Sequence, residues 1–220
     1  MKKIFLAMIM LLATVSASYA QNTVYLKQIG SSSTILLEQL GSNNSIGAVA
    51  NYSQSNGNTN NITVQQTGSS NIHNFSIIGS TNTYSSVISG DSNQFTLNCG
   101  DLQISCSGVT ITETATGNLN TVSQTIKGQN ISSTLAINGS SNQVTTNITQ
   151  SNSTSNIAIT GDTNNVNSTM NAVGGSGSTL GITVLGSSNT ILTTQGGTID
   201  STVKLQVTGT SNNITVHSGN

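Results

Sequence analysis

The side chains with the most individual chemistry are two cysteines that lie close together in the sequence. Cys99 and Cys106 are the only cysteines of the 220-residue chain. Because the N-terminus is typical of an exported protein, which meets an oxidising compartment, we expect a disulfide at the base of a loop. The alternative is two unpaired thiols, with Cys99 filling an inward core position. No histidine or further cysteine lies nearby, which argues against a metal site.

The other reactive side chains are scattered singly. His73 is predicted on the inward face of its strand and His217 on the outward face of the last strand, far apart. A lone inward histidine between apolar neighbours is most often a core residue. Asp91 and Asp162 each follow a turn glycine, where aspartate is favoured for backbone hydrogen bonding. Because no serine, histidine and acid come together and no two carboxylates face each other, we predict no enzyme activity and no cofactor or metal.

A glycine returns every eleven residues along most of the chain, with asparagine three positions later and β-prone residues five, seven and nine positions later. A period this short, sustained this long, is typical of a stacked solenoid. Glycine tolerates positive φ, and asparagine can satisfy local backbone groups. The predicted turn ladder consists of Gly57, Gly68, Gly79, Gly90, Gly117, Gly139, Gly161, Gly186 and Gly209 with Asn60, Asn71, Asn82, Asn93, Asn120, Asn142, Asn164, Asn189 and Asn212.

Between the turns, the residues alternate as in a half-buried strand. After Gly68, the side chains of His73, Phe75 and Ile77 are predicted to point inward and those of Asn74 and Ser76 outward. One strand and one turn cannot close a coil, so two halves of eleven residues should form a rung of about 22 residues. The predicted fold is therefore an all-β solenoid of parallel stacked rungs with a thin two-layer core. Asparagine would stack on asparagine at the turns and glutamine on glutamine near the strand ends.

The composition is polar but nearly uncharged, with 34% hydrophobic and 5% charged residues and neither proline nor tryptophan. Without periodicity such a chain would resemble low-complexity disorder, but the alternation favours order. After residue 20, three lysines face six acidic residues, giving a formal charge of −3. This leaves no basic patch for nucleic acid.

The first twenty residues differ from the rest. Lys2 and Lys3 precede an apolar run over residues 4–13, and Ser18 and Ala20 are the small residues that a signal peptidase reads. We predict a signal peptide over 1–20, because this run is too short for a membrane-spanning helix and no later segment qualifies. Residues 21–220 would form one domain. Extra residues near 47–56, 100–116 and 171–174 interrupt the repeat and are predicted to be loops.

Gln, Gly and a second Gln recur at a fixed spacing in Gln28-x-Gly30-x-x-Ser33-x-Ile35-x-x-x-Gln39-x-Gly41-x-x-Asn44-x-Ile46, and Gln66-x-Gly68-x-x-Asn71 repeats part of this pattern. These residues resemble the curlin repeat, and the resemblance extends with varying fidelity from about Val24 to the C-terminus. The resemblance implies a secreted bacterial subunit that polymerises outside the cell into functional amyloid fibres for adhesion and biofilm matrix. It also implies copies of itself, a nucleator or major curlin-type subunit and a secretion channel as partners. The second glutamine of the repeat is often an apolar residue here, as at Ile77, Ile88 and Met170.

A solenoid has two ends with unpaired backbone groups, which monomeric solenoids normally cover. We expect the last rung of one copy to pair with the first rung of the next, through edges that contain Val24, Leu26, Gln28, Ile214 and Val216. The protein would then be a secreted, extracellular or cell-surface fibre subunit. One alternative is a non-polymerising β-solenoid adhesin or surface-binding module. Another is an ice-binding solenoid, for which the threonine register is expected to drift too much, as at Thr110, Thr112, Thr145 and Thr146.

Overall fold

The protein is described by a computed structural model. The described residues are 21–29, 34–41, 43–47, 53–56, 59–68, 70–79, 81–90, 92–100, 106, 108–117, 119–139, 141–161, 163–172, 177–186, 188–197, 202–209 and 211–218. The predicted signal peptide lies outside these residues.

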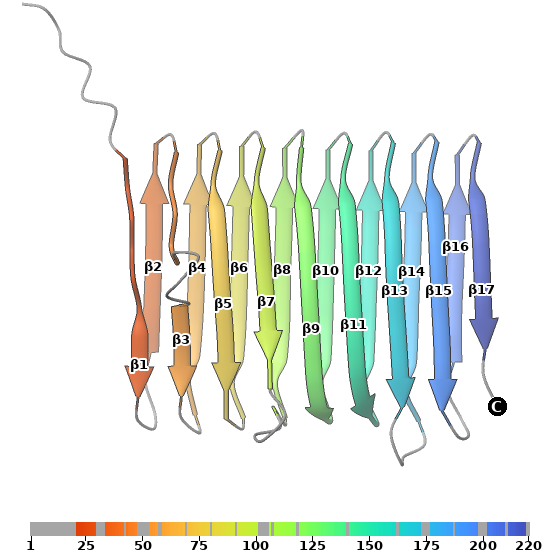
Figure 1. Ribbon diagram of the computed structural model, residues 1–220, viewed down its shortest axis with the longest axis horizontal. Helices are drawn as coiled ribbons and strands as arrows, with labels where there is room; N and C mark the ends of the chain where they lie inside the picture. Colours follow the sequence, from red (N-terminus) through yellow and green to blue (C-terminus); the bar gives the residue numbers. More distant parts are fainter. Residues whose placement is uncertain are drawn as a thin grey trace, which may run out of the picture.

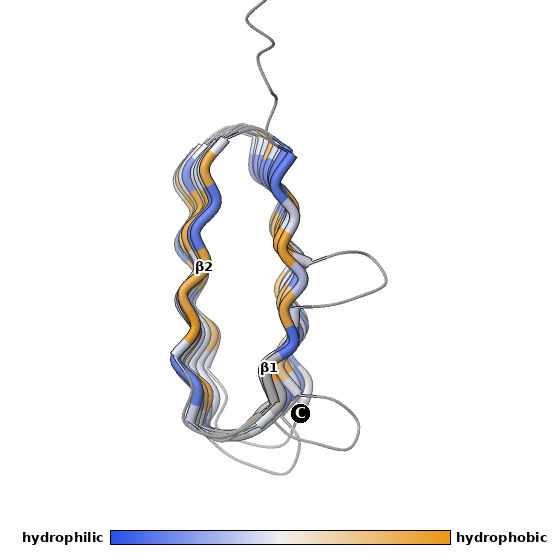
Figure 2. Tube along the Cα trace, turned by 90° about the vertical axis from the view of Figure 1, so that its left-hand side faces the viewer, coloured by the Kyte–Doolittle hydropathy of each residue, from blue (hydrophilic) through white to orange (hydrophobic). Residues whose placement is uncertain are grey.

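The described strands form two sheets that face each other (Figures 1 and 2). The nine-stranded sheet contains β1 (Lys27–Ile29), β3 (Ser53–Asn56), β5 (Ile72–Ile78), β7 (Gln94–Cys99), β9 (Thr121–Gln129), β11 (Gln143–Ser151), β13 (Asn165–Ala172), β15 (Thr190–Gly197) and β17 (Asn213–Ser218). The eight-stranded sheet contains β2 (Thr34–Leu40), β4 (Asn61–Thr67), β6 (Thr83–Ser89), β8 (Thr110–Thr116), β10 (Ser132–Asn138), β12 (Thr154–Thr160), β14 (Thr179–Leu185) and β16 (Thr202–Thr208). Successive strands alternate between the sheets, and every strand pair is parallel. The predicted all-β solenoid is confirmed.

The strand register follows the period read from the sequence. Gln54 pairs with Ser76, 22 residues later, and Thr110 pairs with Ser132 at the same interval. The interval is longer where extra residues were noted, as between Thr34 and its partner Asn61. The additional residues leave the register unchanged on either side, so no strand turns its inward face outward.

Alternation along each strand builds a thin core between the sheets. His73, Phe75 and Ile77 are buried as predicted, whereas Asn74 and Ser76 are partly exposed. The same alternation places Ile62 and Val64 of β4 in the core from the opposite sheet. Viewed along the stack, hydrophobic and hydrophilic residues alternate along both layers (Figure 2). Because each strand contributes only two or three inward side chains, the core depends on contacts between successive rungs.

The turns on one edge of the stack form a continuous column of glycines. Each even-numbered strand is followed by one of these glycines, which are Gly41, Gly68, Gly90, Gly117, Gly139, Gly161, Gly186 and Gly209. A Cβ atom on Gly139 would lie 1.7 Å from the carbonyl oxygen of Gly117, and the φ of Gly139 is 153°. Contact with the preceding rung therefore excludes a side chain, in addition to the positive φ that the sequence predicted.

The opposite edge of the stack has different turns. Gly79 follows β5 and so lies on this second edge, while Gly57 is outside the described residues. The predicted ladder therefore divides into two columns. In the first, each asparagine amide donates to the carbonyl of the glycine three residues earlier, as from Asn142 to Gly139 at 2.7 Å. Among the described residues of the second column, asparagine stands only in the rungs of Asn60 and Asn82. The equivalent position in the later rungs is Val109, Ile131, Ser153 and Ser178.

Candidate functional site

The two ends of the stack are the candidate site, because each leaves one edge of both sheets unpaired among the described residues. β1 and β2 are the outermost strands at one end, and β16 and β17 at the other (Figure 1). The edge of a parallel sheet presents backbone N–H and C=O groups that can pair with a further strand. Each end can therefore accept another parallel strand in either sheet.

At the end formed by β16 and β17, inward side chains remain open to solvent. Ile214 is 46% exposed and Val216 is 44% exposed, although both occupy inward positions. Ile191 pairs with Ile214 in the same column and is 1% exposed, because another rung covers it. Val203, Leu205 and Val207 of β16 are also only partly buried. This end consequently presents an apolar surface of the kind that rung stacking covers elsewhere in the molecule.

The end formed by β1 and β2 carries similar side chains. Val24 and Leu26 are partly exposed, and Leu37 is partly buried against the core. Gln39 is 3% exposed and accepts a hydrogen bond from the Gln66 amide at 2.8 Å. This is a single step of the predicted glutamine ladder, since Ile88 follows Gln66 in the column.

The predicted edge residues therefore lie at opposite ends of one stack. Val24, Leu26 and Gln28 belong to the first end, and Ile214 and Val216 to the last. Gln28 lies in β1, but its side chain is outside the described part of the chain. Within one molecule the fold does not bring the two edges together. Their contact requires two copies.

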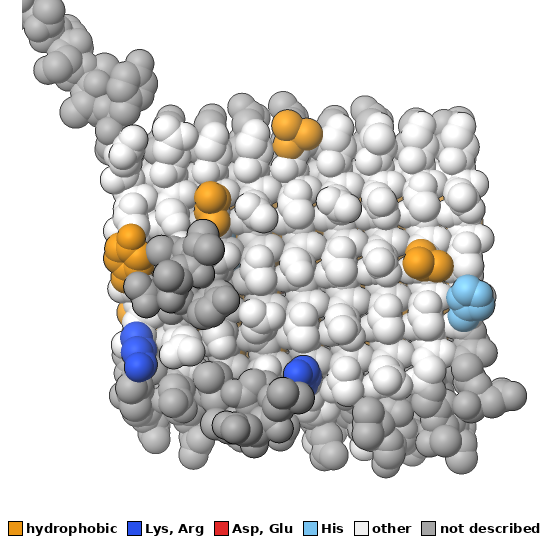
Figure 3. Space-filling view, in the orientation of Figure 1, with side chains coloured by type: hydrophobic (Ala, Val, Ile, Leu, Met, Phe, Trp, Pro, Cys, Tyr) orange, Lys and Arg blue, Asp and Glu red, His pale blue; other side chains and the backbone are white. Residues whose placement is uncertain are grey.

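The outer faces of the sheets carry few charges. On the face of the nine-stranded sheet in Figure 3, most of the atoms that are not grey are white, and only a few side chains carry the colours of charged residues. On this face lie Lys27 of β1, Lys127 of β9 and His217 of β17. Stacked strands place equivalent side chains about 4.8 Å apart, so a face of uncharged residues avoids repulsion between rungs.

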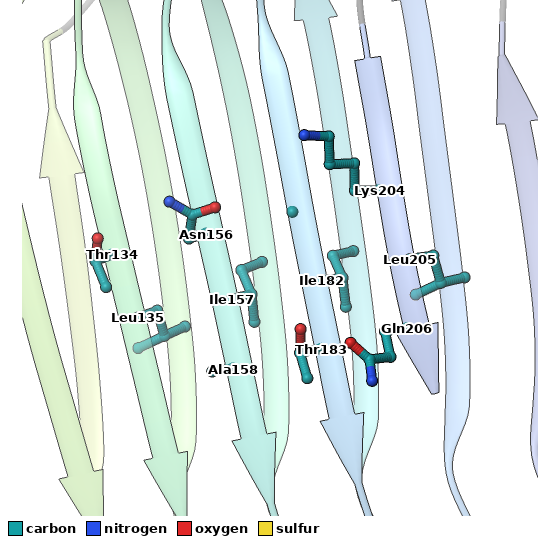
Figure 4. A pocket seen from close by; sticks show the side chains of 11 residues that line it. Thr134, Leu135, Asn156, Ile157, Ala158, Ile182, Thr183, Lys204, Leu205 and Gln206 are labelled. Atoms are coloured by element: carbon teal, nitrogen blue, oxygen red, sulfur yellow. The ribbon is translucent and has the colours of Figure 1, made fainter. Parts of the chain in front are cut away.

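The eight-stranded sheet has a hollow on its outer face (Figure 4). Its volume is about 350 Å³, and Thr134, Asn156, Ala158, Thr183 and Lys204 are among the residues that line it. The hollow lies over small residues of the sheet. It contains a lysine, amides and hydroxyls, but none of the histidine, cysteine or carboxylate groups that perform most acid–base or nucleophilic chemistry.

Threonine recurs at the first outward position of the eight-stranded sheet. The column reads Thr34, Asn61, Thr83, Thr110, Ser132, Thr154, Thr179 and Thr202. The expected drift of the threonine register is wrong for this column, because the loops absorb the extra residues. Thr146, by contrast, points inward and is 1% exposed.

A buried polar cluster crosses the core between the two sheets. The Tyr84 hydroxyl and the His73 Nε2 atom are 2.6 Å apart, and the Gln124 amide donates to the Glu113 carboxyl. Burial lowers the pKa of His73 to about 3 and raises the pKa of Glu113 to about 8. Burial also raises the pKa of Tyr84 well above its ordinary value, and the nearby Glu113 adds to this effect. The histidine and the carboxyl are therefore both neutral near pH 7.

The sequence analysis predicts the inward position of His73 but does not single out Glu113. Its position can be inferred from the sequence, because residues two, four and six positions before a turn glycine point inward. Ile88, Ser86 and Tyr84 stand in these positions before Gly90. Glu113 stands four positions before Gly117 and is fully buried.

The two cysteines form a disulfide in the structure. Cys99 ends β7, and its Cα atom lies 5.5 Å from that of Cys106. Both side chains are fully buried. A Cβ atom on Gly128 would lie 1.4 Å from the Cys106 carbonyl oxygen, so the chain re-enters the stack tightly beneath the next turn. The prediction of a loop over 100–116 is wrong at its end, because residues 110–116 form β8. Residues 101–105 and 107 of that range lie outside the described residues.

The described residues were also compared with the requirements of metal sites and membrane spans. Within the described ranges, no group of three or more His, Cys, Asp or Glu residues is placed to hold a metal ion. No helix in that part of the chain is both long and apolar enough to cross a membrane. The class that the fold defines is a parallel, two-sheet β-solenoid, in which the outermost described strands have no described strand beyond them. Comparisons with protein-family models, curated proteins and solved structures find no match.

Proposed function

We propose that this protein is a structural subunit that polymerises end to end into extracellular, amyloid-type fibres. The observation that carries the proposal is the exposure of Ile214 and Val216 at inward positions of β17, whose outer edge pairs with no other described strand. Another parallel rung would cover both side chains and satisfy the edge. The β1 and β2 end of a second copy offers such a rung.

Two further features support the proposal. The internal rungs already pair in parallel and in register, so joining two copies would extend the same contacts. Only 5% of the residues are charged, so stacked strands bring few like charges together.

The resemblance of the sequence to the curlin repeat supports a role for these fibres outside a bacterial cell. We propose that the fibres are bacterial, reach the cell surface through the export signal over 1–20, and serve adhesion and biofilm matrix. Other copies of the chain are the principal partner. A nucleator or major curlin-type subunit and a secretion channel are the further partners that the resemblance implies. A chain that acts only as a structural subunit requires neither catalysis nor a cofactor.

Fibre formation can be tested with purified residues 21–220. The protein should elongate preformed seeds of itself into fibres that bind thioflavin and diffract at about 4.8 Å and about 10 Å, the spacings of strands and sheets. A chain that stays a soluble monomer at high concentration, even with seeds, would refute the proposal.

A matched pair of variants tests whether the β17 end is the growing surface. Val216 and Thr215 are adjacent in β17, and the first points inward and the second outward. Val216→Lys should leave the monomer folded, because the side chain is already 44% exposed there. In a fibre the lysine would be buried without a partner, so elongation should fall by at least about 100-fold. Thr215→Lys should elongate nearly as fast as the wild type; equal rates for both variants would contradict this prediction.

The threonine column supports a second candidate function, which is ice binding. Its hydroxyl groups stand on a regular sheet at strand intervals of about 4.8 Å, so they could order water molecules into a lattice. Thermal hysteresis measured with the monomer tests this function. A substitution of Thr110 by lysine should abolish hysteresis if the column binds ice, and should not affect fibre growth.

A further inference from the structure

The number of strands constrains how two copies can meet. The first and last strands that the structure describes, β1 and β17, both belong to the nine-stranded sheet. Across the core, β16 lies between β15 and β17, whereas β17 has only β16 as a described neighbour (Figure 1). Ile214 of β17 is accordingly more exposed than the apolar residues of β16. At each end, the nine-stranded sheet therefore extends beyond the eight-stranded sheet and forms a step.

A second copy stacked in the same orientation cannot fill this step. Its β1 would pair with β17, and its β2 would follow one layer further from the first copy. The position beside β16 would then stay vacant, and a gap one strand wide would interrupt the eight-stranded sheet at every junction. Such a gap would leave part of the inward face of β17 uncovered and two strand edges of the eight-stranded sheet unpaired.

A half turn about the long axis of the stack removes the gap. The two sheets run in opposite directions, as their arrows show in Figure 1, so this rotation exchanges the sheets and keeps all strands parallel. We propose that successive copies in the fibre are related by a rotation of half a turn about the fibre axis, an inference that rests on the proposed fibre function. β1 of the second copy then pairs with β16, and β2 of the second copy pairs with β17. Both sheets continue without interruption.

The two halves of a rung are similar enough to allow this exchange. In both sheets the inward residues stand five, seven and nine positions after a turn glycine, as after Gly68 in one sheet and after Gly79 in the other. In the half-turn arrangement, Ile35 and Leu37 of the second copy lie on Ile214 and Val216. Val24 and Leu26 of the second copy lie in the same way on Val203 and Leu205. Apolar side chains therefore meet apolar side chains in both sheets.

The outward side chains at the junction are compatible with the half turn. The exposed side chain of His217 would lie beside Glu38 of the second copy after a half turn, but beside Lys27 of the second copy in direct stacking. An imidazole N–H group can donate a hydrogen bond to the Glu38 carboxylate. Lys204 would also lie beside the aromatic ring of Tyr25, which is 63% exposed in the free chain.

Two double variants distinguish the arrangements. His217→Cys with Glu38→Cys places thiols on neighbouring strands only after a half turn, and His217→Cys with Lys27→Cys does so only in direct stacking. Paired parallel strands lie about 4.8 Å apart, which a disulfide can span. All three positions are exposed, so neither pair should affect folding. After mild oxidation of the fibres, non-reducing gels and mass spectrometry of the linked peptides should show intermolecular bonds in the first variant at least 10-fold more often than in the second.

The remaining outcomes refute the inference in distinguishable ways. Fibres that cross-link through residues 217 and 27, through both pairs or through neither would exclude the half turn and leave the fibre function standing. The helical symmetry of wild-type fibres, from electron cryomicroscopy, provides an independent measurement. It should show a rotation near 180° for each rise of about 41 Å, which corresponds to half of the described strands at the usual strand spacing. A rotation near zero would exclude the half turn, and a chain that forms no fibres would refute both proposals.

Discussion

Replacing Glu113 with glutamine should change how the stability of this protein depends on pH. The side chain is fully buried in β8, where it accepts a hydrogen bond from the Gln124 amide. Glu113 Oε1 and Gln124 Oε1 have no hydrogen-bond partner among the described residues. Protonation of Glu113 would supply the donor that these two oxygens lack. This geometry agrees with a carboxyl whose pKa is raised to about 8 by burial.

The sign of the effect follows from the difference between the folded and unfolded chains. In the unfolded chain the carboxyl releases its proton near pH 4.5, whereas in the folded chain it keeps the proton to about pH 8. The contribution to folding is therefore complete below pH 4.5 and is lost as the pH rises to about 8. The loss amounts to at most about 5 kcal/mol of unfolding free energy. Glutamine cannot ionise and can form the same amide hydrogen bond, so Glu113→Gln should remove this loss.

Urea unfolding of the monomer, followed by circular dichroism between pH 6.5 and 9, measures the difference. Over this range Glu113→Gln should become progressively more stable than the wild type, and the difference should level off near pH 9. His73 does not interfere, because its lowered pKa costs stability only as the pH falls from 6.5 towards 3. Glu38→Gln, a change on an exposed outward residue of β2, is the control and should show no such trend. Parallel pH profiles for Glu113→Gln and the wild type would refute this reasoning.

Two further predictions concern the turns and the disulfide. Gly139→Ala should destabilise the monomer by at least about 3 kcal/mol in thermal unfolding, because its Cβ would overlap the Gly117 carbonyl and its φ is positive. Gly196→Ala is the control: its nearest atom would be 3.7 Å away, and a loss of stability equal to that of Gly139→Ala would show that the contact is unimportant. Reducing the bond between Cys99 and Cys106 should lower the unfolding free energy by about 2–3 kcal/mol, because the loop between them gains conformational entropy in the unfolded chain. An unchanged urea midpoint after verified reduction would contradict that estimate.

The fold could be predicted from the sequence because one short signal is repeated many times. Each glycine marks a turn and each alternation marks a strand, so the inward positions of His73, Phe75 and Ile77 follow from counting. The division of the turns into two columns was less accessible. Gly68 and Gly79 have the same local sequence pattern, and only the closing of the coil separates them onto opposite edges.

The interior chemistry was harder to predict than the fold. Glu113 follows an insertion whose length is not a multiple of the repeat, so the count from Gly90 loses the register there. Counting backward from Gly117 restores it. The contact between Tyr84 and His73 depends on which strands of the two sheets face each other across the core. The alternation of residues along a strand does not give this arrangement. The candidate edge residues were named from the sequence, but the step between β16 and β17 required the complete order of the strands.

The tolerance of the stack for added residues has a consequence for engineering. Extra sequence between Thr34 and Asn61 leaves the pairing of β2 with β4 in register, and the same holds between Thr83 and Thr110. Foreign peptides grafted at these two places would leave the hydrogen bonds of the ladder in place. In a polymer of this chain, every graft would recur once per molecule at a fixed spacing. The assembly would then be a scaffold that displays enzymes or epitopes at regular intervals.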